Sequence, residues 1–246
     1  MNSCARTDIG KIRKINQDAV FASAGPVGTL PNLFLVADGM GGHKAGDFAS
    51  SFAVRYMVRL AGETREKSAV AALRSMIEKT NTLLFEQSIH SPELEGMGTT
   101  LVSAIVENNV LYVANVGDSR LYLLRDHLEQ ITRDHSYVEE MVLLGKLERG
   151  SEAYRSQKNI ITRAIGIGPV VEADMFEIPL TCGDLILLCS DGLTNMVDDE
   201  EIGRILKASG TLEEKTDTLI RRANENGGKD NIAVVLLEPQ ISEVNV

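Results

Sequence analysis

Four aspartates stand at the ends of apolar runs, in turns made of glycine and small polar residues. The four turns are Ala37-Asp38-Gly39, Val116-Gly117-Asp118-Ser119, Cys189-Ser190-Asp191-Gly192 and Gly228-Lys229-Asp230-Asn231. Each alone is an ordinary turn, because Asp bonds to nearby backbone and Asp-Gly suits tight hairpins. Together, with few bases nearby to pair them, they suggest carboxylates that converge in the fold. The spacing of the four turns in the sequence does not by itself show that they converge.

Carboxylates that converge would need a cation. They raise one another's pKa unless positive charge neutralises them. Oxygen ligands without clustered His or Cys favour a hard ion such as Mg²⁺ or Mn²⁺ over zinc. After Asp38, the glycines at 39, 41 and 42 would let the backbone turn sharply and leave nearby carbonyls open to a ligand.

Composition bounds the class of protein. The chain has 246 residues, 43% of them hydrophobic, and a net charge of −10 from 35 acidic and 25 basic residues. The length suits one large core or two modest ones, and the acidic balance argues against a general nucleic-acid-binding surface. The three cysteines, Cys4, Cys182 and Cys189, are scattered, which fits a reducing compartment. We see no signal-like N-terminus and no stretch of membrane-spanning length, so we expect a cytoplasmic protein without membrane insertion.

Hydrophobic periodicity predicts the elements that must position the turns. Apolar residues four apart, from Phe48 to Leu60, predict a helix that begins at Ala45 and ends at Gly62. Further helices are predicted at 70–84, 200–208 and 212–225, and strands at 19–22, 33–38, 99–106, 110–116, 121–124, 172–178, 185–189 and 231–237. His135 stands at a predicted helix start, where it would cap or pack, with a catalytic role as the alternative. Hairpin strands with helices in two separate pairs indicate antiparallel sheets covered by helices.

Short motifs follow one another in a defined order along the chain. They are Arg13-x-x-Asn16-Gln17-Asp18, Asp38-Gly39-Met40-Gly41-Gly42-His43, Gly98-Thr99-Thr100, Gly117-Asp118-Ser119-Arg120, Ser190-Asp191-Gly192 and Gly228-Lys229-Asp230-Asn231. No single motif is specific, but the ordered set resembles the metal-dependent serine/threonine phosphatases, the protein phosphatase 2C family, in its bacterial branch. The resemblance covers about residues 7–237. It implies a single catalytic domain over residues 1–246 with an α+β fold. That fold is a four-layer αββα sandwich, in which two antiparallel sheets are flanked by pairs of helices and the metal centre lies at one end.

The resemblance also implies a centre of two Mn²⁺ or Mg²⁺ ions. Asp38 would bridge both ions and the Gly39 carbonyl would bind the first, while Asp191 and Asp230 would bind the second. Asp18 would hold water bound to the ions. With Asp191, Asp118 matches the position that binds a third ion in bacterial members. Water activated by the ions would then attack phosphorus without a covalent intermediate.

Two further residues receive roles from the resemblance. The planar fork of Arg13 suits a grip on the substrate phosphate. Many eukaryotic members have His at the position of Met40, as the proposed acid for the leaving group. Here the nearest histidine is His43, which serves as the acid or only begins the following helix.

The expected substrates are proteins phosphorylated on serine or threonine. The bacterial branch often works opposite a serine/threonine kinase, so we expect this protein to remove the phosphates that such a kinase adds. We also expect a monomer. Gly145–Lys158 is polar and weakly patterned, so we expect a mobile surface segment that governs the choice of protein substrate. In the resembling family a mobile flap occupies this region.

Three alternatives remain at this stage. One is a phosphatase dedicated to a single regulatory phosphoprotein of the anti-sigma type. Another is a non-catalytic module that binds phosphoproteins, although Asp38, Asp118, Asp191 and Asp230 are all present. The third is another two-metal phosphoesterase such as a nuclease, which the acidic balance disfavours.

Overall fold

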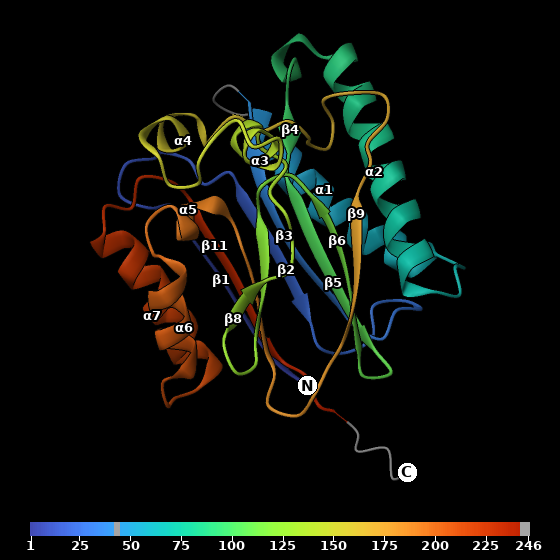
Figure 1. The fold of residues 1–246 in the computed structure, drawn as a ribbon. Coiled ribbons are helices and arrows are strands. Elements are labelled where there is room, and N and C mark those ends of the chain that lie inside the picture. Colours follow the sequence, from blue (N-terminus) through green and yellow to red (C-terminus); the bar gives the residue numbers. More distant parts are fainter. Residues whose placement is uncertain (42–44, 242–246) are drawn as a thin grey trace.

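Two antiparallel β-sheets pack face to face, and helices cover the outer face of each (Figure 1). The computed structural model describes residues 1–41 and 45–241. One sheet has the order β1 (Asn2–Asp8), β11 (Ile232–Glu238), β10 (Leu185–Cys189), β7 (Arg120–Leu124) and β8 (Leu128–Gln130). The other has the order β2 (Asp18–Ser23), β3 (Leu33–Met40), β5 (Leu101–Glu107), β6 (Val110–Val116) and β9 (Asp174–Pro179), with β4 (Gly98–Thr99) beside β3. The predicted four-layer sandwich is confirmed.

The helices form a long pair on one side, a pair with a short extra helix on the other side, and a group at one end. On the β3 side lie α1 (Ala45–Glu63) and α2 (Ala69–His90), followed by a short 3₁₀ turn at Pro92–Leu94. On the other side lie α5 (Asp191–Thr194), α6 (Asp199–Lys207) and α7 (Leu212–Glu225). Between β8 and β9 the chain forms α3 (Tyr137–Leu143) and α4 (Glu152–Gln157) at the upper end of the sandwich in Figure 1. No helix in the described part of the chain is long and apolar enough to cross a bilayer.

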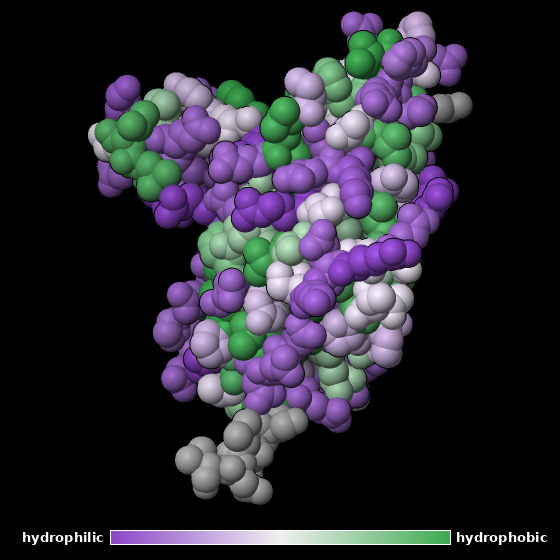
Figure 2. All heavy atoms as spheres, turned by 90° about the vertical axis from the view of Figure 1, so that its right-hand side faces the viewer, coloured by the Kyte–Doolittle hydropathy of each residue, from purple (hydrophilic) through white to green (hydrophobic). Residues whose placement is uncertain are grey.

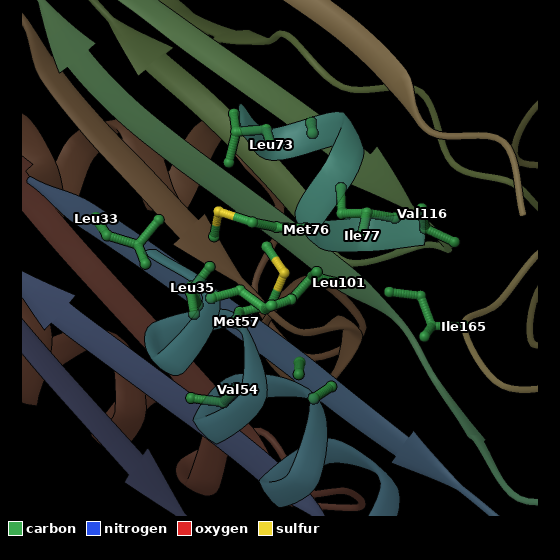
Figure 3. Close-up of a cluster of buried hydrophobic side chains, with 14 of the residues drawn as sticks. Leu33, Leu35, Val54, Met57, Leu73, Met76, Ile77, Leu101, Val116 and Ile165 are labelled. Atoms are coloured by element: carbon green, nitrogen blue, oxygen red, sulfur yellow. The ribbon is translucent and has the colours of Figure 1, made fainter. Parts of the chain in front are cut away.

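Strand alternation divides the buried side chains into three apolar layers. In β3, Leu33 and Leu35 face α1 and α2, whereas Phe34 and Val36 face the opposite sheet. Figure 3 shows the first of these layers, where Leu35 lies beside Met57 of α1 and Met76 of α2. Because β3 is buried on both faces, it reads as a continuous apolar run, and that run is the signal visible in the sequence.

Three features of the fold were not predicted. Strand β1 has few apolar residues because it is an edge strand, which pairs only with β11 and buries Cys4. Strand β8 is only three residues long. The segment 145–158, expected to be weakly structured, contains α4, which Ser151 caps by accepting from the Tyr154 N–H.

Candidate metal centre

Strand pairing places Asp18 directly opposite Asp38. The two residues are Cα partners at the ends of β2 and β3. Like charges in directly opposed positions destabilise a sheet, so this register is costly unless something offsets the repulsion. The Ser190 hydroxyl donates to Oδ2 of Asp18 at 2.6 Å, which links this pair to the other sheet.

The second sheet contributes Asp191 and Asp230. Asp191 begins α5 immediately after β10, and Asp230 immediately precedes the Asn231–Ile232 entry into the antiparallel neighbour β11. Gly192 permits the close approach of these two segments, because a Cβ there would lie 1.8 Å from the Asn231 carbonyl oxygen. The Asn195 amide donates to Oδ2 of Asp191 at 2.8 Å and fixes its orientation.

Asp118 completes the group from the turn after β6. It is buried, with 6% of its surface exposed. The preceding Gly117 has φ +106°, a conformation that favours glycine, and a Cβ there would lie 2.6 Å from the Thr100 methyl carbon. The neighbouring Ser119 hydroxyl shares a hydrogen bond of 2.7 Å with that of Thr100.

Electrostatics show that the five carboxylates share one site. The pKa of Asp38 is raised well above its ordinary value, first by desolvation and then by the charges of Asp18, Asp191, Asp118 and Asp230. Desolvation followed by the charge of Asp191 raises the pKa of Asp18 and of Asp118 to about 8. Burial and the charge of Asp230 raise the pKa of Asp191. The convergence suggested by the four turns is therefore present, with Asp18 as a fifth member.

Unpartnered oxygens in this cluster fit a cation. Oδ1 of Asp18, Asp118 and Asp191 is buried without a hydrogen-bond partner in the described part of the chain. Buried polar atoms are normally paired, so such oxygens call for a ligand. Across residues 1–41 and 45–241, however, no three His, Cys, Asp or Glu side chains are already gathered as a ready set of metal ligands. The carboxylates lie within electrostatic range, and bound ions would have to draw them closer.

The Gly98-Thr99-Thr100 motif holds Asp38 in place. The Thr100 hydroxyl accepts from the Asp38 N–H at 2.9 Å, and the Asp38 carbonyl accepts from the Thr99 hydroxyl and the Thr100 N–H, both at 2.9 Å. The sequence marked these threonines as a motif but gave them no role. Their position directly after a glycine at a predicted strand start was the available signal.

Asn231 plays a comparable part for the loop that carries Arg13. Its side chain accepts from the Gln17 N–H at 2.8 Å and donates to the carbonyls of Ile9 and Ile15. Arg13 is exposed and donates from Nη2 to Oδ2 of Asp230 at 2.8 Å. The loop and the Asp230 turn are thus fixed to one another.

The remaining candidates divide into placed and unplaced residues. Gly39 follows Asp38 in β3 and pairs with Thr99. His43 lies outside the described residues, so its expected role as an acid stays a prediction. His135 is buried beside the Asp118 turn, and Ser136, not His135, caps α3.

The metal-free protein should lose stability as the pH rises from about 6.5 to 8. Because Asp18 and Asp118 have a pKa of about 8 when folded, against 3.8 when unfolded, the folded state retains protons that the unfolded chain has released. Each retained proton lowers the free energy of unfolding by about 1.4 kcal/mol per pH unit. Below about 6.5 the lowered pKa of His135 acts in the opposite sense, since the unfolded chain then binds the extra proton. Urea unfolding of EDTA-treated protein measures the trend, which excess Mg²⁺ should flatten. Stability that rises over this window would contradict the buried cluster.

Comparisons with known proteins point to one family. The family model described as Protein phosphatase 2C matches residues 12–237. The serine/threonine phosphatase stp of Listeria monocytogenes serotype 4b is 42% identical over 250 residues, covering 99% of this chain and 98% of that protein. The crystal structure of the serine/threonine phosphatase Stp1 from Staphylococcus aureus is 36% identical, with a TM-score of 0.90 over 97% of this chain and 94% of that one.

A second solved structure bears on the metal. The catalytic domain of the serine/threonine protein phosphatase PstP, in complex with two manganese ions, is 36% identical and has a TM-score of 0.84 over 96% of each chain. The family match spans most of the chain, and the sequence and fold likenesses cover nearly all of it. This chain belongs to the protein phosphatase 2C family.

Proposed function

We propose that the five carboxylates form the metal centre of a protein serine/threonine phosphatase that uses Mn²⁺ or Mg²⁺. The observation that carries this proposal is the cluster itself, in which three buried carboxylate oxygens have no partner in the described part of the chain. Membership of the protein phosphatase 2C family supports the activity. The two manganese ions of the PstP structure support the choice and number of metals.

The proposed ligands are those that membership of the family implies, and the clustering of the five carboxylates supports them. Asp38 lies among the other four carboxylates, so it is the residue best placed to contact both ions, with the Gly39 carbonyl beside it. Asp191 and Asp230 would hold the second ion, Asp118 with Asp191 a third, and Asp18 would orient water. When bound, such ions supply positive charge and acidify water for attack on phosphorus. Asn195 orients the Asp191 carboxylate, while Thr99 and Thr100 hold the main chain of Asp38.

Arg13 is proposed to bind the substrate phosphate. Its contact with Asp230 uses Nη2, and a guanidinium carries five N–H donors in a planar fork. Asp230 therefore orients the fork while other donors face a phosphate. The charges of Asp38 and Asp191 contribute to the raised pKa of Arg13, which supports a position of the guanidinium close to the cluster.

Residues 145–158, the flap, are proposed to select protein substrates. Glu139 of α3 anchors the flap by accepting from Arg149 and from the Tyr154 hydroxyl. Tyr154 and Lys158 then line a cavity of about 160 Å³ together with Asp118 and Asp191. Arg149 of the flap also lines a groove of about 670 Å³, and a side view shows a lobe overhanging a hollow (Figure 2). A phosphoprotein that reaches the carboxylates would touch these surfaces.

The expected substrates include proteins modified by a serine/threonine kinase, and the expected oligomeric state is a monomer.

Two observations favour a protein phosphatase over a nuclease. The net charge is −10, and a polyanionic strand binds through a basic groove. The relatives that match nearly the whole chain include serine/threonine phosphatases.

Turnover of a phosphothreonine peptide, with an oligonucleotide as the competing substrate, tests this proposal. The peptide should be hydrolysed with Mn²⁺ or Mg²⁺, and EDTA should abolish turnover. The ions should also raise the melting temperature, because they bind the folded state. Full turnover in excess EDTA, or cleavage of the oligonucleotide alone, would overturn the proposal.

Asp191→Asn should remove most turnover while stabilising the metal-free protein. The substitution deletes a charge from a repelling cluster, so the metal-free melting temperature should rise, and the increase caused by Mn²⁺ should shrink. Residues that only support a metal ligand typically cost about 10- to 100-fold when mutated, and we expect a larger loss here. Asp198→Asn is the matched control, since it makes the same change at the exposed cap of α6 and leaves a capping side chain. Equal effects of the two variants would contradict a metal-ligand role for Asp191.

Arg13→Ala should raise KM for para-nitrophenyl phosphate more than it changes the metal concentration needed for half-maximal rate. Loss of a charge-assisted hydrogen bond costs about 1.5–3 kcal/mol, or roughly 10- to 150-fold in kcat/KM. Arg13→Lys keeps the charge but loses the fork, so it should recover only part of the loss. An unchanged kcat/KM in Arg13→Ala would remove the proposed phosphate contact.

A further inference from the structure

His135 is hydrogen-bonded on every polar side and is 6% exposed. Its ring Nδ1 accepts from the Gly117 N–H at 3.0 Å, and its backbone N–H donates to the Gly117 carbonyl at 3.0 Å. The His135 carbonyl accepts from the Thr162 N–H at 2.8 Å. His135 therefore forms hydrogen bonds with both the N–H and the carbonyl of Gly117, the glycine that precedes Asp118.

These contacts determine which ring nitrogen carries the proton. A backbone N–H can only donate, so Nδ1 must offer a lone pair to Gly117. The proton of the neutral ring is then on Nε2, which lies 3.1 Å from Oδ2 of Asp174. Arg163 fixes Asp174 in turn by donating to Oδ1 at 2.7 Å, and it also donates to the Glu172 carbonyl. Nη1 of Arg163 lies 3.2 Å from Nε2 of His135 as well, but a guanidinium only donates, so with the proton on Nε2 this contact is not a hydrogen bond. Asp174 and Arg163 thus orient the imidazole toward Gly117.

Gly117 sets the direction of Asp118. Its carbonyl belongs to the peptide that leads into Asp118, and it accepts from both the His135 N–H and the Asn115 amide. The positive φ of Gly117 and the close Thr100 side chain leave this peptide little freedom. Oδ1 of Asp118 is buried and has no hydrogen-bond partner among the described residues, so no such bond fixes the position of this oxygen directly. Its position depends on the backbone before it.

We propose that His135 is a positioning residue for the metal centre, which holds the Gly117 peptide so that Asp118 faces Asp191. The inference rests on the proposed function for its consequence in turnover, but its structural part is independent of turnover. In the described part of the chain His135 bonds to none of the five clustered carboxylates, and it acts through Gly117. A purely packing role would require only a side chain of similar volume.

Two amide variants separate positioning from packing. In His135→Asn, the side-chain oxygen can occupy the place of Nδ1 and accept from the Gly117 N–H. In His135→Gln, the amide lies one carbon farther out, near the place of Nε2, so the acceptor beside Gly117 is lost. Both variants are uncharged amides, and melting curves show whether each one folds.

Three measurements on the full-length protein test the proposal. ¹⁵N NMR should show the Nε2–H tautomer of His135, and the Gly117 amide resonance should be preserved in His135→Asn and displaced in His135→Gln. The rise of melting temperature with Mg²⁺ should show an affinity weakened about 10- to 100-fold in His135→Gln, with most of it recovered in His135→Asn. In phosphothreonine-peptide turnover, adding His135→Gln to Asp118→Asn should cost nothing further, because both changes disable the same oxygen.

The outcomes distinguish this proposal from the proposed function. An Nδ1–H tautomer, equal Mg²⁺ affinity in the two folded amide variants, or losses that multiply in the double variant would overturn the role of His135. Should the wild type hydrolyse no phosphopeptide, the phosphatase proposal fails, while the tautomer and the Mg²⁺ titration still decide whether His135 positions Asp118. If His135→Gln does not fold, the Asn variant and the wild-type tautomer provide the test.

Discussion

Electrostatic repulsion among Asp18, Asp38, Asp118, Asp191 and Asp230 is the constraint around which this end of the molecule is built. Charges taken out of water are costly unless they are paired, and here carboxylates face carboxylates. The surrounding groups do not remove the repulsion. They fix the backbone firmly enough to withstand it, as Thr99 and Thr100 do for Asp38. The sandwich itself brings the carboxylates together, because several turns of its antiparallel strands lie at the same end of the molecule.

The site exists only when both sheets are assembled. Asp18, Asp38 and Asp118 come from the β2–β3–β5–β6 sheet, whereas Asp191 and Asp230 come from the β10–β11 sheet. The Ser190 hydroxyl bonded to Asp18 is one direct link between them. Metal affinity and the packing of the two sheets are therefore expected to be linked, because a site divided in this way has no counterpart in the unfolded chain.

Local patterns in the sequence were enough to predict most elements and the four Asp turns. Strand β6, for example, follows from a run bounded by Asn108-Asn109 and Gly117, and it has the predicted bounds 110–116. Long-range geometry was not available. Nothing local shows that Asp18 lies opposite Asp38, because register depends on the partner strand. The short motif around Asp134 suggested a helix start for His135, with a catalytic role as the alternative, but its decisive contact is with Gly117, eighteen residues earlier. The edge strand β1 escaped prediction because one buried residue, Cys4, leaves no alternating pattern.

The nearby cations explain why the cluster needs an outside ion. Arg120 donates to both carboxylate oxygens of Asp134, and Arg13 is held by Asp230. Lys158 acts on Asp191, and burial lowers the pKa of Lys158 itself; a single ammonium group does not balance five carboxylates. The raised pKa values of Asp18 and Asp118, about 8, mean that without metal the cluster reduces its charge by holding protons. Protons and divalent cations therefore compete for the same oxygens, and metal binding must release protons near neutral pH. The carboxylates that repel one another in the folded chain are, for that reason, the same groups that give it affinity for a metal.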